Sequence, residues 1–201
     1  MIVVIDYKAG NLYNVGNAMR HLGVPYIFSG DSSTVAAASK IILPGVGSAS
    51  AAMDSLRERG LLEVLKHSKV PFLGICLGLQ LLFVSSQEED TPCLDILPGR
   101  VQRFDSSQKK VPHIGWNQVH LTQPHPVFKN IPQGSYFYFV HSYFADPVDR
   151  QTVIGTTNYG DTFCSVLAFD NILATQFHPE KSGQIGLTIY DNFMKWIRQK
   201  R

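Results

Sequence analysis

The chain is organised around the stretch Val70-Pro-Phe-Leu-Gly-Ile-Cys-Leu-Gly-Leu-Gln80. Within it, Phe72–Ile75 is a short, continuous apolar run. Such a run is typical of a strand buried on both faces, as in a parallel sheet. The leucines that follow recur at helical spacing, so we predict a helix that continues to about Ser86. The period therefore changes at Cys76, where the predicted strand ends.

Cys76 is framed as Gly74-Ile-Cys-Leu-Gly78, which is the nucleophile-elbow pattern with Cys in place of Ser. The glycines allow a strand and a helix to cross at a tight turn. This arrangement would place the thiol at the end of a central strand, beside a helix N-terminus whose dipole favours the thiolate. A buried structural cysteine is the alternative, and this pattern alone leaves it open.

The composition is that of a globular chain. It has 201 residues, of which 44% are hydrophobic and 17% charged, with a net charge of +2. That charge is too small to indicate nucleic-acid binding. The three cysteines are far apart, so they predict neither a disulfide framework nor a zinc site, and they favour a reducing compartment. We see no targeting segment and no apolar run of membrane-spanning length, so we expect a cytoplasmic protein.

The first half of the chain alternates strand-like and helix-like segments. We predict strands at 1–6, 24–28, 40–43 and 72–75, and helices at 11–22 and 51–66, the second broken near Gly60. This alternation favours a parallel, doubly wound sheet.

The second half is rich in strand-like segments separated by turn residues. We predict strands at 97–104, 111–121, 135–143, 153–159, 163–169 and 172–177, with hairpin turns at 158–161 and 169–171. Ser182 is expected to cap a final helix whose apolar face comprises Ile185, Ile189, Phe193, Trp196 and Ile197. The fold class is thus α/β, a mixed sheet with a parallel core, an added antiparallel group and helices on both faces. With no linker or repeat, we expect one domain over 1–201.

A second candidate for chemistry is Gln176-Phe-His-Pro-Glu180. Residues before proline favour extended backbone, in which positions i and i+2 point to the same side. His178 and Glu180 could therefore pair. With Cys76 they would supply the nucleophile, the general acid–base and the orienting carboxylate of a thiol triad. A surface turn with a solvated carboxylate is the alternative.

Together these segments resemble class I (triad-type) glutamine amidotransferases over nearly the whole chain. Within that class they are similar to the glutaminase subunits that serve a cyclase in histidine biosynthesis. The resemblance rests on Asp6-Tyr-Lys-Ala-Gly-Asn-Leu12, Pro44-Gly-Val-Gly47, Gly74–Phe83, Pro112-His-Ile-Gly-Trp-Asn117, Tyr138-Phe-Val-His-Ser-Tyr143 and Gln176–Ser182. It departs at Lys8, where such proteins usually carry Gly, and at residues 48–50. The fold that it implies is the flavodoxin-like mixed sheet of that class.

The resemblance implies a role for each site residue. Cys76 would attack the side-chain amide of glutamine, His178 would protonate the leaving ammonia, and Glu180 would hold the imidazole. Leu77, Val46 and Gly47 would form the oxyanion hole. The residues expected to hold the amino and carboxylate groups of glutamine are Gln80, Glu88, Ser142 and Tyr143. No cofactor or metal is expected, and Cys93 and Cys164 carry no assigned role.

The resemblance also implies a partner. The predicted fold leaves no domain for an ammonia acceptor, so a (β/α)8-barrel cyclase subunit should dock over the site and form imidazole glycerol phosphate and an aminoimidazole carboxamide ribotide. The interface candidates are Trp116, Asn117, Tyr138 and Lys181. Two alternatives remain open. One is the glutaminase subunit of another synthase, such as pyridoxal phosphate synthase, where a Gly-Gly-Glu-Ser type motif is usual. The other is a γ-glutamyl or cysteine hydrolase without a partner.

Overall fold

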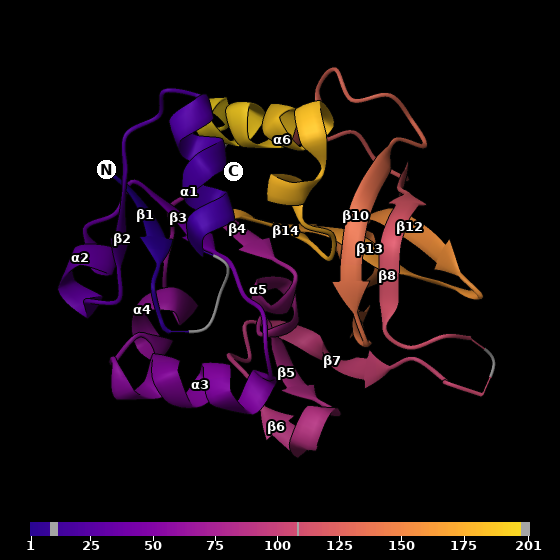
Figure 1. Ribbon diagram of the computed structural model, residues 1–201. Coiled ribbons are helices and arrows are strands. Elements are labelled where there is room, and N and C mark those ends of the chain that lie inside the picture. Colours follow the sequence, from indigo (N-terminus) through magenta and orange to yellow (C-terminus); the bar gives the residue numbers. More distant parts are fainter. Residues whose placement is uncertain (9–11, 108, 198–201) are drawn as a thin grey trace.

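A mixed sheet runs through the centre of the molecule (Figure 1). The computed structural model describes residues 1–8, 12–107 and 109–197. Neighbouring strands of the core, in the order β2-β1-β3-β4-β14, pair in parallel. Their bounds are β1 Ile2–Ile5, β2 Tyr26–Ser29, β3 Lys40–Leu43, β4 Phe72–Ile75 and β14 Ile172–Thr175. The parallel core predicted from the apolar runs is confirmed.

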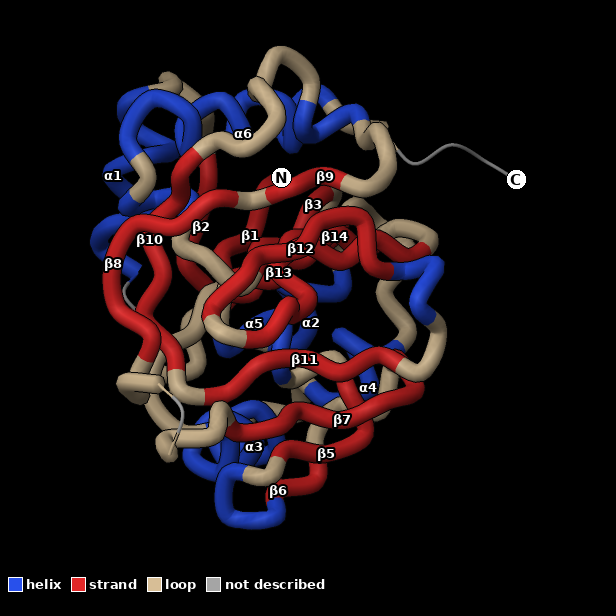
Figure 2. The backbone as a smooth tube through the Cα atoms, turned by 90° about the vertical axis from the view of Figure 1, so that its right-hand side faces the viewer, coloured by secondary structure: helices blue, strands red, loops and turns tan. Residues whose placement is uncertain are grey.

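Helices cover both faces of this core (Figure 2). They are α1 Leu12–His21, α2 Ser32–Ala36, α3 Ala49–Glu58, α4 Leu62–Lys66, α5 Leu77–Gln80 and α6 Gly183–Lys195. Val3 and Ile5 of β1 pack in the cluster that contains α3, whereas Val4 packs in the cluster that contains α1 and α6. Strands β1, β3, β4 and β14 are thus buried on both sides, which is why their sequences are almost entirely apolar, whereas the edge strand β2 is partly exposed. Among the described helices, none combines the length and apolar character that crossing a membrane requires.

A mostly antiparallel group extends the sheet beyond β14, as predicted, although β5 and β7 within it pair in parallel. Strand β13 pairs antiparallel with β14 and is followed across the sheet by β11, β7, β5 and β6, while β12 and β9 branch from β13. Strands β8 and β10 form a separate two-stranded antiparallel ribbon. The bounds are β5 Phe83–Ser86, β6 Thr91–Pro92, β7 Leu97–Arg103, β8 His113–Gln118, β9 His120–Leu121, β10 Tyr136–His141, β11 Tyr143–Pro147, β12 Val153–Tyr159 and β13 Asp161–Phe169. Short 3-10 turns are η1 Glu88–Asp90, η2 Pro126–Phe128, η3 Arg150–Thr152 and η4 Pro179–Lys181.

The predicted helix from the elbow to Ser86 is wrong beyond Gln80. Helix α5 ends at Gln80, and Phe83–Ser86 is the strand β5. The reason is tertiary: β5 pairs in parallel with β7, with Phe83 opposite Leu97, and this pairing overrides the local helical spacing. The predicted strand at 111–121 is two strands, β8 and β9, because the ladder is interrupted at Val119. The predicted strand at 135–143 is β10, which ends before Ser142, and Tyr143 already begins β11.

The ends of the predicted helices also need correction. Ser182 precedes α6, but its hydroxyl does not cap the helix: it donates to the His178 carbonyl oxygen at 2.6 Å and accepts from the Tyr138 N–H at 3.0 Å. Ile197 lies beyond the end of α6 and is exposed, whereas Ile189 and Phe193 are buried as expected. The predicted break near Gly60 is confirmed, since α3 ends before it and α4 begins after it. Residues 9–11, which include the predicted start of the first helix, lie outside the described residues.

Candidate active site

Cys76 lies at the turn between β4 and α5 in an unusual backbone conformation, with φ 53° and ψ −105°. The turn is tight because Gly78 passes against β3: a Cβ at Gly78 would lie 1.9 Å from the Leu43 carbonyl oxygen. The Cys76 N–H donates to the Thr175 carbonyl oxygen at 2.7 Å, which ties the elbow to β14. The predicted elbow geometry is confirmed. Helix α5 is a single turn, so its local N–H groups matter more to the thiolate than a macrodipole does.

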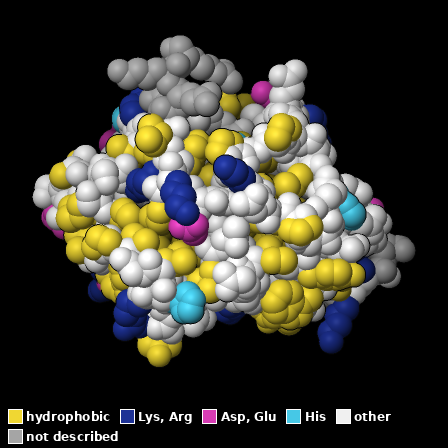
Figure 3. All heavy atoms as spheres, turned by 90° about the horizontal axis from the view of Figure 1, so that it is seen from above, with side chains coloured by type: hydrophobic (Ala, Val, Ile, Leu, Met, Phe, Trp, Pro, Cys, Tyr) yellow, Lys and Arg dark blue, Asp and Glu magenta, His cyan; other side chains and the backbone are white. Residues whose placement is uncertain are grey.

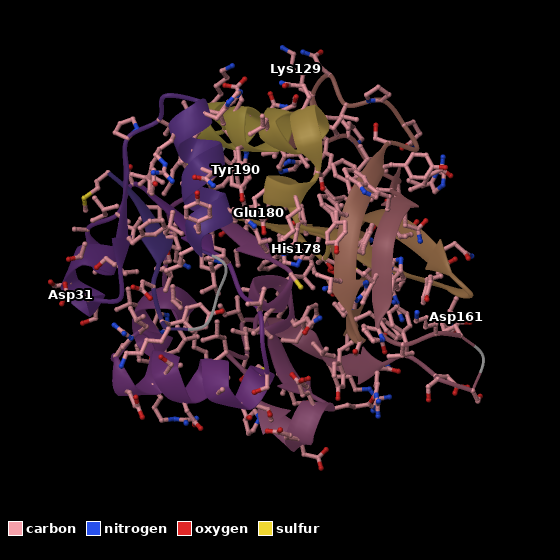
Figure 4. All side chains as sticks on the ribbon, viewed as in Figure 1. Asp31, Lys129, Asp161, His178, Glu180 and Tyr190 are labelled. Carbon is pink, nitrogen blue, oxygen red and sulfur yellow. The ribbon has the colours of Figure 1, made fainter. Side chains whose placement is uncertain are left out.

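His178 and Glu180 form a buried pair next to this elbow. The His178 Nδ1 and Glu180 Oε1 atoms are 2.7 Å apart, and both side chains are about 2% exposed. His178 itself is extended, but Glu180 lies in the 3-10 turn η4, so the pairing does not arise from a continuous extended segment as predicted. Figure 4 shows the two side chains in line, between α6 and the centre of the sheet.

The protonation of His178 is set by its two neighbours. Burial alone would lower its pKa, but the nearby Cys76 sulfur and the Glu180 carboxylate, which accepts from Nδ1, outweigh burial and raise the pKa to about 10. Since Nδ1–H donates to Glu180, Nε2 is the nitrogen left for the thiol and substrate. The site therefore favours an imidazolium, which is both the ionic partner of a thiolate and a proton donor.

A cavity of about 410 Å³ opens beside the thiol. Most of the residues predicted to form the site line it. The lining residues are Val46, Gly47, Cys76, Leu77, Gln80, Glu88, Pro112, Val140, His141, Ser142, Tyr143 and Lys181. The structure thus brings the predicted nucleophile, oxyanion residues and substrate-binding residues to one place, and Lys181 of the predicted interface reaches the same cavity. His178 and Glu180 lie behind the thiol, buried in the wall.

The segment Pro44–Gly47 has a fixed base and an exposed tip. Tyr7 Oη donates to the Pro44 carbonyl oxygen at 2.7 Å, and burial holds the pKa of Tyr7 well above its usual value. Val46 and Gly47 are exposed, and Gly47 has φ 100°, a conformation that side-chain-bearing residues rarely adopt. Leu77, at the other wall, is the first residue of α5, so its N–H is one of those that a helix leaves without an internal acceptor.

Two predicted substrate residues already make hydrogen bonds within the protein. Gln80 Nε2 donates to the Tyr143 carbonyl oxygen at 2.9 Å and to Gln176 Oε1 at 3.1 Å. Glu88 Oε2 accepts the N–H of Ala49 at 2.7 Å, at the start of α3. Gln80 therefore connects α5 to β11, and Glu88 is joined to the helix that follows Gly47.

The predicted interface residues divide into two groups. Trp116 and Tyr138 are opposite each other on the β8–β10 ribbon, with ring centroids 6.2 Å apart, and the Lys181 ammonium lies 5.5 Å from the Tyr138 ring. Asn117 points the other way: its Nδ2 donates to the Asn158 carbonyl oxygen at 2.9 Å and lies 3.3 Å from His113 Nε2. Asn117 thus lies on the interior face of the ribbon, where it binds a neighbouring strand and not a docking surface.

The sequence reasoning missed several residues. Gln176 is fully buried, and its Nε2 donates to the Cys76 sulfur at 3.6 Å. Ile114 and Tyr136 are more than half exposed on the same face of the ribbon as Trp116. Strict alternation along β10, with Phe137 and Phe139 buried, was the signal that could have found this face. In the view from above, hydrophobic side chains gather at this edge of the molecule, at the lower right of Figure 3.

Beneath that face, two buried histidines join the ribbon to the cavity. His141 Nδ1 lies 2.7 Å from the Tyr143 carbonyl oxygen, so it must carry the proton that it donates. His141 Nε2 is then the acceptor for His113 Nδ1–H at 3.0 Å, which leaves His113 Nε2 to accept from Asn117. Every ring nitrogen is satisfied with both rings neutral. Burial lowers the pKa of His113 to about 4 and that of His141 to about 3.

Comparison with known proteins identifies the class to which this fold and site belong. Residues 3–196 match the family model described as glutamine amidotransferase class-I. A solved structure titled glutamine amidotransferase superposes with a TM-score of 0.75 at 16% identity, covering 97% of this chain and 98% of that chain. A putative GMP synthase subunit from Thermoplasma acidophilum gives 0.72 at 21% identity, covering 96% and 92%. The chain belongs to the class-I glutamine amidotransferases.

Curated relatives of the chain place it in one family within this class. Imidazole glycerol phosphate synthase subunit HisH of Dehalococcoides mccartyi strain CBDB1 is 46% identical over 97% of each chain. The subunit of the same name from Syntrophotalea carbinolica is 47% identical, covering 96% of this chain and 98% of its own. Within its class the chain is therefore a member of the family of glutaminase subunits of imidazole glycerol phosphate synthase.

Proposed function

We propose that Cys76, His178 and Glu180 form the catalytic triad that releases ammonia from glutamine. The Cys76 thiolate attacks the side-chain amide carbon and a tetrahedral oxyanion forms. The carbon–nitrogen bond then breaks, and His178 donates its proton to the departing ammonia. Water hydrolyses the remaining thioester to glutamate and restores the thiol. The 2.7 Å contact between His178 and Glu180, directly behind a nucleophile on an elbow, is the observation that carries this assignment.

The oxyanion hole is assigned to Leu77 on one side and to Val46 and Gly47 on the other. All three line the cavity next to the sulfur. Leu77 offers an N–H at the start of α5, and the positive φ of Gly47 allows that segment to turn a backbone N–H toward or away from the oxyanion. Loss of one such donor typically costs about 10²- to 10³-fold in turnover.

Glutamine is assigned to the same cavity. Glu88 is the only carboxylate among the cavity's described lining residues, so it is the natural partner for the substrate ammonium. Ser142, Tyr143 and Gln80 line the same cavity and are assigned to the carboxylate end. Because Glu88 also accepts the Ala49 N–H, binding of an ammonium group there would affect the start of α3, two residues after Gly47.

We further propose that a (β/α)8-barrel cyclase subunit docks over the β8–β10 ribbon and receives the ammonia. The exposed side chains Ile114, Trp116 and Tyr136 form an apolar face, and Lys181 lies between that face and the cavity. The products of the coupled reaction would be imidazole glycerol phosphate and an aminoimidazole carboxamide ribotide. We place the protein in the cytoplasm and assign residues 1–201 to one amidotransferase domain.

The test is Cys76→Ala in the complex with the cyclase subunit. We expect the variant to lose glutamine-dependent activity and to keep activity with added ammonium, since the thiol serves only the cleavage of the amide. Cys93→Ala is the matched control, because Cys93 is half-buried outside the lining of the cavity. Glutaminase activity of Cys76→Ala above about a hundredth of wild type would contradict the assignment of the nucleophile.

A further inference from the structure

Behind Glu180 lies a second buried polar side chain, Tyr190 of α6. Its hydroxyl and the Glu180 Oε2 atom are both fully buried, and neither has a hydrogen-bond partner within standard geometry among the described residues. Figure 4 shows Tyr190, Glu180 and His178 in succession, leading from α6 toward the elbow. Glu180 is an electrostatic neighbour of Tyr190, so the two unpartnered atoms lie close together in the core, which is unusual because buried polar groups are nearly always paired.

The path of α6 explains why Tyr190 reaches this place. Gly186 lies against the turn η4: a Cβ at Gly186 would be 1.9 Å from the Pro179 carbonyl oxygen. Tyr190 follows Gly186 by four residues, so both occupy the helix face that packs on this turn. The glycine thus lets the helix approach closely, and the tyrosine extends from the next turn toward the carboxylate.

The chemistry of the two groups is complementary. Burial and the nearby Glu180 carboxylate hold the pKa of Tyr190 well above its ordinary value. The phenol therefore stays protonated, and toward a carboxylate it can act only as a donor. Glu180 Oε1 is already occupied by His178 Nδ1–H, which leaves Oε2 as the atom that needs a donor.

We propose that Tyr190 is a positioning residue that donates its hydroxyl hydrogen to Glu180 Oε2 and so extends the triad by one member. The inference rests on the triad assignment proposed above. By holding Oε2, the phenol fixes the plane of the carboxylate. The carboxylate held in that plane in turn stabilises the His178 imidazolium. Tyr190 thus acts on catalysis through Glu180 and touches neither substrate nor thiol.

The experiment is Tyr190→Phe, which keeps the ring and removes only the hydroxyl. We expect the kcat for glutamine in the complex to fall about tenfold with little change in KM, because a hydrogen bond to a charged group is lost. The basic limb of the pH profile should move to lower pH, because a less stable imidazolium loses its proton sooner.

Controls separate this role from packing. Tyr26→Phe removes another tyrosine hydroxyl, which donates to the Gly16 carbonyl oxygen at 3.2 Å and not to Glu180, and should leave kcat and both pH limbs unchanged. In a Glu180→Gln background, Tyr190→Phe should cause no further loss, since its effect passes through the carboxylate. A kcat within twofold of wild type and an unmoved basic limb would overturn the inference. If Cys76→Ala and His178→Ala are inactive in the same assay, that result would leave the triad itself intact.

Discussion

His113→Phe should make the fold less sensitive to acid. His113 is 3% exposed, and its ring stacks 4.0 Å from the Tyr159 ring and 5.0 Å from the Phe139 ring, so a phenyl ring can occupy its place. Burial lowers its pKa to about 4, against an ordinary value of 6.5. The folded state keeps the imidazole neutral, while the unfolded chain takes up a proton below pH 6.5. The stability that depends on this group is therefore present above pH 6.5 and is lost as the pH falls toward 4.

The magnitude follows from linkage. At pH 5, roughly 1.5 units below the ordinary pKa, each buried neutral histidine costs about 2 kcal/mol of unfolding free energy, at about 1.36 kcal/mol per unit. Between pH 8 and pH 5 the wild type should therefore lose about 4 kcal/mol of unfolding free energy through His113 and His141 together. The variant should lose about 2 kcal/mol, through His141 alone. At pH 8 the variant should itself be about 1 kcal/mol less stable, because His141 Nε2 loses its donor.

Urea unfolding at pH 8 and pH 5 measures the difference. With a slope of about 2 kcal/mol per molar urea, the acid-induced drop in midpoint should be about 1 M smaller in His113→Phe than in wild type. His21→Gln, which removes an exposed histidine at the end of α1, is the control for the loss of a histidine from solvent. Equal acid-induced losses in wild type and His113→Phe, within about 0.5 kcal/mol, would refute the reasoning.

Three further predictions concern activity and binding of the cyclase subunit. His178→Ala should be almost inactive, and Glu180→Gln should lose orders of magnitude in glutamine turnover, though less than His178→Ala; a Glu180→Gln pH profile equal to wild type would exclude the triad. Gly47→Ala should change the ratio of partner-stimulated to basal glutamate release, because alanine is strained at φ 100° even though its Cβ would meet no atom within 4 Å. Gly45→Ala should instead mainly reduce thermal stability, because its Cβ would lie 2.4 Å from Tyr7 Oη. The measurement is the rate of glutamate release by the chain alone, by the complex, and by the complex with an acceptor analogue. If all three rates agree within about twofold, the partner does not stimulate the reaction and the chain is a constitutive amidase. Trp116→Ala should weaken binding to the cyclase subunit by about 2 kcal/mol in calorimetry, while its melting temperature stays within a few degrees of wild type because Trp116 is 55% exposed. Tyr13→Ala, which changes a 71% exposed aromatic residue on α1, is the control. Equal affinity of Trp116→Ala and wild type for the cyclase subunit would exclude the ribbon as the docking face.

Most of the parallel core could be predicted because β1, β3, β4 and β14 are buried on both faces and therefore read as apolar runs. The short strand β5 could not: Phe83-Val-Ser-Ser86 has no strong period, and only pairing with β7 makes it a strand. Asn117 is predicted at the interface because its segment matches the family, yet neighbours along a strand point to opposite faces, and Asn117 points away from the face of Trp116. Lys8, where the resemblance predicts Gly, has φ 62°, a backbone conformation that glycine adopts more readily than residues with side chains.

The approach of Cys76 to His178 depends on sheet register, which motifs alone do not contain. Strands β4 and β14 are neighbours, with Ile75 opposite Thr175, so the residues just beyond each strand emerge at the same edge. A slip of one residue would turn the side chains of β14 to the opposite faces and separate the pair. His178 is also fixed from a third direction, because its N–H donates to the Tyr138 carbonyl oxygen at 2.9 Å. Tyr138 belongs to the ribbon that carries the exposed apolar face. A protein that docks on this ribbon can therefore shift the backbone of His178, the proposed proton donor. We expect docking to change the rate of glutamine turnover as well as to collect the ammonia.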